Sequence, residues 1–258
     1  MRKYFFIVTF FLLFYTIAEA VDTPWNEEYN QMLIRKAARK SPLLANYPYL
    51  EYPDQHIEEI LSKYPEQKVL IFSYGSLMNH ESAMRTISPE ALNTMQPALA
   101  FGLKRIFNYK AGGNLSRWGN DLYPNERAML NIDERTNWQS LINGVVLEAD
   151  AKDLQKLLDR ETGYNLVPIL IVDWNQAISE NPCIKVEVAY AFLLPGEMQR
   201  DMSEKITYYP VRGYLHAVRN GASEFGPEFL DFFNSTTYLD NGATLINQWD
   251  EQDFSGTP

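Results

Sequence analysis

A short strand that ends in a turn of small residues is the feature that most constrains this chain. Residues Val69 to Phe72 form an apolar run with high β-propensity, which is typical of a strand in the middle of a sheet. Ser73-Tyr-Gly-Ser76 interrupts that run, and Gly75 lets a ligand approach the main chain closely. Such a turn can direct several backbone N–H groups at one point, which suits a carboxylate or an oxyanion. Taken alone, these residues favour an ordinary strand-to-loop turn.

A second stretch, further along the chain, favours a functional role for this turn when the two stretches are considered together. Asp150 can cap a helix over residues 151–160, where leucines recur at helical spacing. Glu161 follows this helix, Gly163 ends it, and an apolar strand is expected at 164–172. Alone, Glu161 fits a solvated surface residue best. An acidic residue at a helix C-terminus is slightly disfavoured by the helix dipole, which is a weak indication of another purpose.

Together the two stretches resemble the γ-glutamyl cyclotransferase-like superfamily, which includes the ChaC-type and AIG2-like proteins. In that superfamily a Tyr-Gly-Ser loop follows the first strand, and a catalytic glutamate precedes a Gly-Tyr and a strand. Tyr74-Gly-Ser76 and Glu161 stand in this order here. Gly102-Leu-Lys-Arg-Ile-Phe107 resembles the family's Gly-x-x-Arg-x-Phe segment, and Pro210–Ala222 resembles its closing helix. The resemblance covers roughly residues 67–235.

Expected strands outnumber expected helices. We expect strands over residues 69–72, 98–109, 127–133, 142–150, 164–172 and 184–194, and helices over 57–61, 151–160, 210–222 and 227–233, with another that starts at 88. The two kinds of element do not alternate strictly, which indicates a mixed α+β domain with a curled sheet. The resemblance implies a more particular fold, a small closed mixed β-barrel with helices flanking it.

The resemblance also implies a reaction on a small γ-glutamyl substrate. In the superfamily, the α-amine of a γ-glutamyl group attacks its own γ-carbonyl, which releases 5-oxoproline and an amine or amino acid. Glu161 is the implied general base, and a partly desolvated carboxyl with a raised pKa would suit that role. The implied substrate-binding residues are Ser73, Tyr74, Gly75, Ser76, Leu77, Tyr164, Tyr190 and Tyr214, with no metal and no cofactor. Tyr190 lies on an alternating strand, so a plain core position fits it nearly as well.

The first twenty residues have the anatomy of a secretory signal peptide. Arg2 and Lys3 precede the apolar stretch Tyr4–Ile17, and Ala18-Glu-Ala20 is a small-x-small ending. This pattern predicts cleavage before Val21 and an exported protein, periplasmic or secreted. The apolar stretch is shorter than the roughly 20 residues of a membrane span, so an uncleaved membrane anchor is the less favoured alternative. After cleavage no membrane association is expected.

The remaining chain is expected to form one domain with two extensions. Residues 21–66 would be a lead-in, 67–235 the cyclotransferase-like domain and 236–258 an acidic tail. The net charge of -10 argues against a general nucleic-acid surface, which needs clustered Lys and Arg. Cys183 is the only cysteine, so no intramolecular disulfide can form.

The sequence leaves other functions open. A serine hydrolase is disfavoured because Ser76 lacks the G-x-S-x-G elbow. A metal enzyme is disfavoured because no two histidines stand at ligand spacing. The main alternative is a non-catalytic exported protein that uses the same pocket for a glutamyl-like ligand or a protein partner. Asn114 and Asn234 begin glycosylation sequons, which chance explains at least as well.

The substrate within the γ-glutamyl class also stays open. Leu77 is the ChaC-like residue at its position, while Ser73 stands where the family more often has Gly or Ala. The run Arg160-Glu-Thr-Gly-Tyr164 has one glycine fewer than the ChaC-type pattern.

Overall fold

The computed structural model describes residues 57–64, 66–112, 115–119, 121–133, 140–177, 185–194 and 208–249. The expectations for the signal peptide, most of the lead-in, Asn114, Cys183 and the end of the tail lie outside these residues. Within the described ranges, no helix combines the length and the apolar character needed to cross a bilayer.

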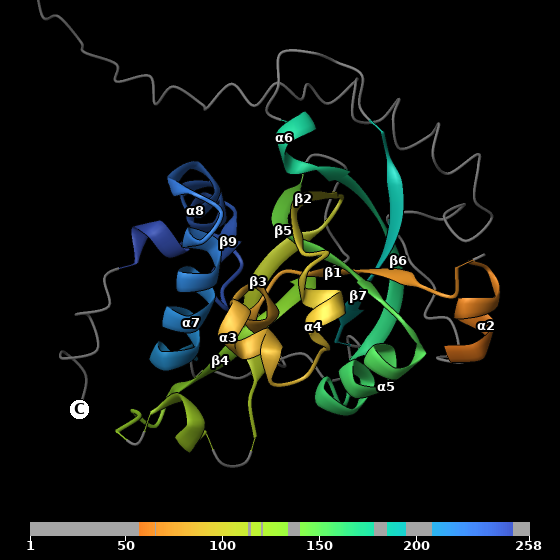
Figure 1. Cartoon of the computed structure of the whole chain (residues 1–258). Coiled ribbons are helices and arrows are strands. Elements are labelled where there is room, and N and C mark those ends of the chain that lie inside the picture. Colours follow the sequence, from red (N-terminus) through yellow and green to blue (C-terminus); the bar gives the residue numbers. More distant parts are fainter. Residues whose placement is uncertain are drawn as a thin grey trace, which may run out of the picture.

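Five strands close into a barrel, as Figure 1 shows. Their order around the barrel is β1 (Val69–Ser73), β5 (Leu141–Ala149), β2 (Gln96–Phe101), β6 (Asn165–Asp173) and β7 (Glu187–Leu193). Neighbours are antiparallel except β1 and β7, which run parallel. The central residues of β6 are buried throughout, because side chains on both faces of the barrel wall pack against other elements. The expected α+β fold, a closed barrel with helices outside, is confirmed.

A second sheet stands beside the barrel. It has the order β8 (Tyr209–Pro210), β4 (Glu126–Asp133), β3 (Lys104–Lys110) and β9 (Thr237–Tyr238). The expected single strand over residues 98–109 is wrong, because β2 and β3 belong to different sheets. Gly102 separates them with a φ of 69°, a left-handed backbone conformation that favours glycine.

Helices cover the outside of both sheets. They are α2 (Ile57–Ser62), α3 (His80–Met84), α4 (Pro89–Leu92), α5 (Ala151–Arg160), α6 (Trp174–Ala177), α7 (Arg212–Ser223) and α8 (Pro227–Ser235), with short 3₁₀ turns η2 (Ser76–Met78), η3 (Ser116–Trp118) and η5 (Ile246–Gln248). The expected caps are present: the side chain of Asp150 accepts a hydrogen bond from the Asp153 N–H, and Ser88 accepts one from Ala91. In Figure 1, α7 and α8 lie together on one side of the molecule, and α2 and α5 lie on the other.

A fully buried arginine joins the second sheet to the barrel. Arg105 on β3 donates from Nη1 to the backbone oxygen of Asn143 at 2.6 Å and from Nη2 to its Oδ1 at 2.9 Å. Nε donates to Thr237 Oγ1 at 2.7 Å, and Nη2 reaches the Phe233 carbonyl at 3.2 Å. Within the described residues no carboxylate meets this guanidinium. The negative end of the α8 dipole and neutral oxygens compensate its charge instead.

The packed domain extends past both boundaries expected from the sequence. Thr237 pairs with Arg105 in the second sheet, and Ile246 is fully buried. At the other end, α2 packs against α5 through the buried side chains of Ile60 and Leu61. Residues 237–249 therefore contribute buried side chains to the core.

Candidate active site

A small cavity lies at the end of β1, where the chain enters the Ser73–Leu77 turn. Its volume is about 40 Å³. Space of this size holds about three water molecules, so only the end of a ligand can enter it. The lining residues are Phe72, Ser73, Tyr74, Gly75, Ser76, Leu77, Leu130, Glu161, Tyr164 and Phe192.

Helix α7 packs against the turn that forms one wall of this cavity. A Cβ added to Gly221 of α7 would lie 2.4 Å from the backbone nitrogen of Asn79, so the helix packs directly on the backbone that follows η2. A Cβ added to Gly75 would lie 2.8 Å from the Tyr214 hydroxyl oxygen. A side chain at Gly221 would therefore clash with backbone, and one at Gly75 would fit only if the Tyr214 ring moved. These two contacts set where the backbone of the turn lies.

We expect Gly75→Ala to impair the site more than the fold. The new methyl group would displace the Tyr214 hydroxyl and shift the turn, and small displacements of this kind can cost up to about 10²-fold in rate. Substrate turnover and thermal unfolding should be compared with those of Gly112→Ala, where a Cβ meets nothing within 4 Å. Equal activity of the two variants would contradict this role for Gly75.

Glu161 lies where α5 ends and faces the cavity. It is the C-cap residue, with φ -93° and ψ 42°, and its N–H donates to the Leu157 carbonyl at 2.9 Å. The side chain keeps 23% of its surface exposed, enough for a ligand to reach the carboxylate. Burial raises the pKa of the Glu161 carboxyl, and the charges of Arg160 and Arg117 oppose this by lowering it.

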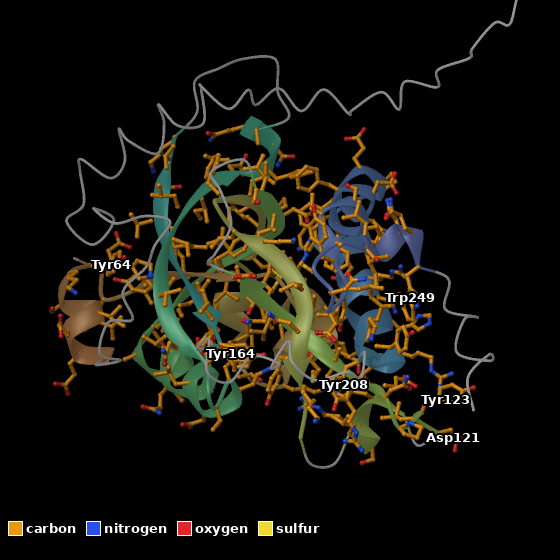
Figure 2. All side chains as sticks on the ribbon, turned by 180° about the vertical axis from the view of Figure 1, so that it is seen from behind. Tyr64, Asp121, Tyr123, Tyr164, Tyr208 and Trp249 are labelled. Carbon is orange, nitrogen blue, oxygen red and sulfur yellow. The ribbon has the colours of Figure 1, made fainter. Side chains whose placement is uncertain are left out.

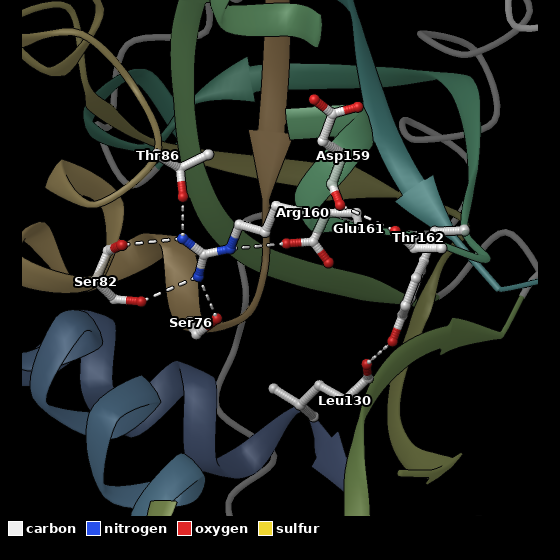
Figure 3. A network of polar contacts seen from close by, with 9 residues as sticks. Ser76, Ser82, Thr86, Leu130, Asp159, Arg160, Glu161 and Thr162 are labelled. Atoms are coloured by element: carbon white, nitrogen blue, oxygen red, sulfur yellow. Dashed lines mark hydrogen bonds and ion pairs between the residues drawn. The ribbon is translucent and has the colours of Figure 1, made fainter. Parts of the chain in front are cut away.

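Arg160, the residue before Glu161, links the Glu161 carboxylate to the turn (Figure 3). Nε pairs with Glu161 Oε1 at 3.2 Å, and Nη2 donates to Ser76 Oγ at 3.0 Å. The remaining donors reach the Ser82 carbonyl and hydroxyl and Thr86 Oγ1, at 2.8–3.0 Å. All five N–H groups of the guanidinium are engaged. Sequence reasoning did not assign Arg160 to the site, although it stands inside the motif that singled out Glu161.

Three tyrosines surround the same place. Tyr74 donates its hydroxyl to the Phe192 carbonyl at 2.6 Å, and Tyr164 donates to the Leu130 carbonyl at 3.2 Å. Burial raises the pKa of both hydroxyls, and also that of Tyr214, well above the usual range. These side chains are therefore neutral donors at ordinary pH.

A β-bulge explains why Leu130 faces two tyrosines. The register between β3 and β4 shifts between Ile106 and Tyr109, which leaves Leu130 of β4 outside the regular ladder. Its carbonyl accepts from Tyr164, and its backbone together with that of Ser76 hydrogen-bonds the Tyr214 oxygen. No sequence signal marked this bulge.

The structure does not bring Tyr190 to the cavity. Its buried side chain belongs to the apolar cluster between β1, α2 and α5, where its ring packs edge-on against Tyr64 at a centroid distance of 6.4 Å. In Figure 2, Tyr64 lies at the α2 end of the molecule, apart from Tyr164. Tyr190 takes the plain core position because its strand directs it away from the turn.

The other sequence-predicted residues do come together. Ser73, Tyr74, Gly75, Ser76, Leu77, Glu161 and Tyr164 line the cavity, and Tyr214 packs behind Gly75. Phe72, Leu130 and Phe192 also line the cavity, and Arg160 contacts Glu161 and Ser76; the sequence did not assign these four residues to the site. Among the described residues, no group of three or more His, Cys, Asp or Glu side chains could hold a metal ion. The arrangement offers one carboxylate of raised pKa beside a turn of small residues and neutral hydroxyl groups.

No protein-family model matches the chain, and no curated protein matches it. Solved structures do. An uncharacterized protein from Homo sapiens is 16% identical with a TM-score of 0.46, covering 73% of this chain and 97% of its own. A protein named gamma-glutamyl cyclotransferase is 15% identical with a TM-score of 0.46, covering 73% and 96%. An AIG2-like protein from Mus musculus is 16% identical with a TM-score of 0.28, covering 56% and 97%. Two of these three carry the names of the family that the sequence motifs resemble.

Proposed function

We propose that the protein is a γ-glutamyl cyclotransferase-like enzyme that needs no cofactor. The observation that carries this proposal is the position of Glu161, a partly exposed carboxylate of raised pKa in a cavity that is also lined by the Ser73–Leu77 turn and by Tyr164. The order of motifs along the chain, which resembles that superfamily, supports the same reaction.

The proposed reaction moves one amide bond within the substrate. The α-nitrogen forms a bond to the γ-carbonyl carbon, and the bond from that carbon to the leaving nitrogen breaks. The α-ammonium first gives a proton to Glu161, and the same nitrogen loses a second proton as the ring closes. Both protons pass to the leaving nitrogen, one of them from Glu161, so the amine departs in its ammonium form and Glu161 is ionised again. No water is consumed, and the products are 5-oxoproline and the free amine. General-base assistance of this kind contributes about 10²–10⁴ in rate.

The turn would hold the two reacting ends together. The backbone N–H groups of Gly75 and Ser76 are the proposed donors to a substrate oxygen. In the free protein the Ser76 N–H donates to the Tyr214 oxygen, and the substrate oxygen would replace it as the acceptor. Orientation matters most here, because well-placed intramolecular reactions gain about 7–11 kcal/mol. A rigid turn packed directly on α7 suits this task better than a mobile loop.

Mass spectrometry of released 5-oxoproline tests the proposal. The purified protein should be incubated with glutathione, with γ-glutamyl dipeptides and with ε-(γ-glutamyl)lysine. We expect release from at least one of them, with no loss of activity on addition of a chelator. Well-folded protein that releases 5-oxoproline from none of them would refute the reaction and would favour a binding role for the same cavity.

We expect Arg160→Gln to shift the pH dependence of this reaction. The charge of Arg160 lowers the pKa of Glu161 against the effect of burial, so its removal should raise that pKa further. Because the base must be ionised, the acidic limb of the kcat/KM profile should move to higher pH. Arg160→Lys, which keeps the charge but not the five-donor fork, should return the limb toward that of the unaltered protein. An unmoved limb in Arg160→Gln would contradict this electrostatic role.

A further inference from the structure

Two arginines lie near the cavity, and they differ in how many of their N–H groups are hydrogen-bonded. The Arg160 guanidinium is engaged at all five N–H groups. Arg117, on η3, is exposed, and among the described residues its guanidinium meets only the ring of Trp118, at 4.9 Å from the centroid. No carboxylate of the described residues pairs with it. Arg117 is therefore the cation near the site that remains available to a ligand.

Packing of η3 against α7 places Arg117 on the same side of the molecule as the Ser73–Leu77 turn. The Trp118 ring packs edge-on against Tyr214 at a centroid distance of 5.2 Å, and the Tyr214 hydroxyl lies directly behind Gly75. A Cβ on Gly213 would clash with the Trp118 carbonyl at 1.8 Å, so the start of α7 is pressed against η3. The ring of Trp118 thus supports the guanidinium and links it to the turn.

The charge of Arg117 acts on the groups of the same site. Its charge lowers the pKa of both Glu161 and Arg160, although Arg117 does not line the cavity. It therefore lies outside the cavity, within electrostatic reach of Glu161. The cavity is too small for more than the reacting end of a ligand, so the rest of the ligand must lie outside it.

From this arrangement we propose that Arg117 binds a carboxylate on the leaving group of the substrate. The inference rests on the proposed function and narrows it: the leaving group would be an amino acid or peptide with a nearby carboxylate, rather than a neutral amine. A cation is needed for such a ligand because the Glu161 carboxylate, ionised as the base must be, repels a second anion. Arg117 acts as a specificity-determining residue and takes no part in the proton transfers.

Two substrates that differ only in this charge provide the test. The kcat/KM of γ-glutamylglycine should be compared with that of γ-glutamylglycinamide, in which a neutral amide replaces the carboxylate. We expect a preference of about five-fold for the acid, the upper range for an exposed ion pair, and a decrease of this preference in high salt. In Arg117→Gln the ratio should fall to one or below, because the Glu161 carboxylate then repels the acid without compensation, and Arg117→Lys should keep part of the preference. The ratio between substrates cancels any effect of the substitution on Glu161 itself.

Lys152→Gln is the matched control, because it removes one exposed positive charge from the first turn of α5, about 12 Å of helix rise from Arg160. It should keep the preference of the unaltered protein. A ratio near one in the unaltered protein, or a preference that survives in Arg117→Gln, would overturn the inference while leaving the reaction intact.

Failure of the reaction itself would be recognised separately. If no 5-oxoproline forms, calorimetric titration of the same proteins with the same two compounds replaces turnover. Tighter binding of the acid that is lost in Arg117→Gln would uphold the carboxylate site without the reaction. Equal binding, or no binding of either compound, would overturn it.

Discussion

Glu161→Gln is expected to lower turnover by at least about 10²-fold while the protein remains folded. Glutamine keeps the size of the side chain and can still accept the hydrogen bond from Arg160 Nε, but it cannot accept the proton of an ammonium group. Release of 5-oxoproline from the best substrate measures the effect. Asp159→Asn, which neutralises an exposed carboxylate two residues earlier on α5, is the matched control and should retain activity. Full activity in Glu161→Gln would show that another group is the base.

The same substitution has an expected effect on stability with a definite sign. The pKa of Glu161 is raised in the folded protein, so the folded state binds a proton more tightly than the unfolded state does. Stability contributed by this group is therefore lost as pH rises from the ordinary carboxyl range through the folded pKa. Glu161→Gln should thus gain in Tm relative to the unaltered protein as pH rises through that window. A relative loss would contradict the raised pKa.

Arg105→Ala is expected to destabilise the fold by at least about 3 kcal/mol. The substitution removes a fully buried side chain and leaves the Asn143 oxygens and the Phe233 carbonyl without their donor. The junction of β3, β5 and the end of α8 would lose its shared partner. Chemical denaturation measures the free energy of unfolding, and a variant that does not fold at all would agree with the prediction.

Arg85→Ala is the control for this effect. Its side chain is 70% exposed and, among the described residues, forms an ion pair with Glu81 of the preceding helix α3, worth about 0.3–0.5 kcal/mol. A similar loss in Arg85→Ala and Arg105→Ala would mean that burial and hydrogen bonding of Arg105 do not hold the two sheets together. Arg105→Met tests the same point with less change in volume, and should recover part of the packing but none of the hydrogen bonds.

Much of the local structure could be predicted because its causes are local. The cap at Asp150 and the helical spacing of leucines placed α5 correctly, and Ser88 followed by a proline placed the start of α4. The apolar run at Val69 marked β1. Each of these signals depends on residues within one or two turns of each other, so the sequence alone carries it.

Elements whose position depends on distant partners were predicted less well. The run over residues 98–109 has strand character throughout, and only the positive φ of Gly102 sends its two halves to different sheets. Tyr190 belongs to a strand with suitable alternation, but pairing with β1 directs its side chain toward Tyr64. The buried pairing of Thr237 with Arg105 could not be inferred from a polar segment near the chain end.

The sequence by itself singled out most residues of the candidate site, because Glu161 and the Ser73–Leu77 turn could be recognised from residue types in a fixed order. Tertiary structure alone decided how those groups meet. Closure of the barrel brings the ends of β1 and α5 to the same cavity. The absence of a side chain at Gly221 lets α7 pack directly on the turn, and Arg160 contacts both Glu161 and Ser76. Contacts between residues more than 80 positions apart depend on packing, and no periodicity or spacing along the chain encodes them.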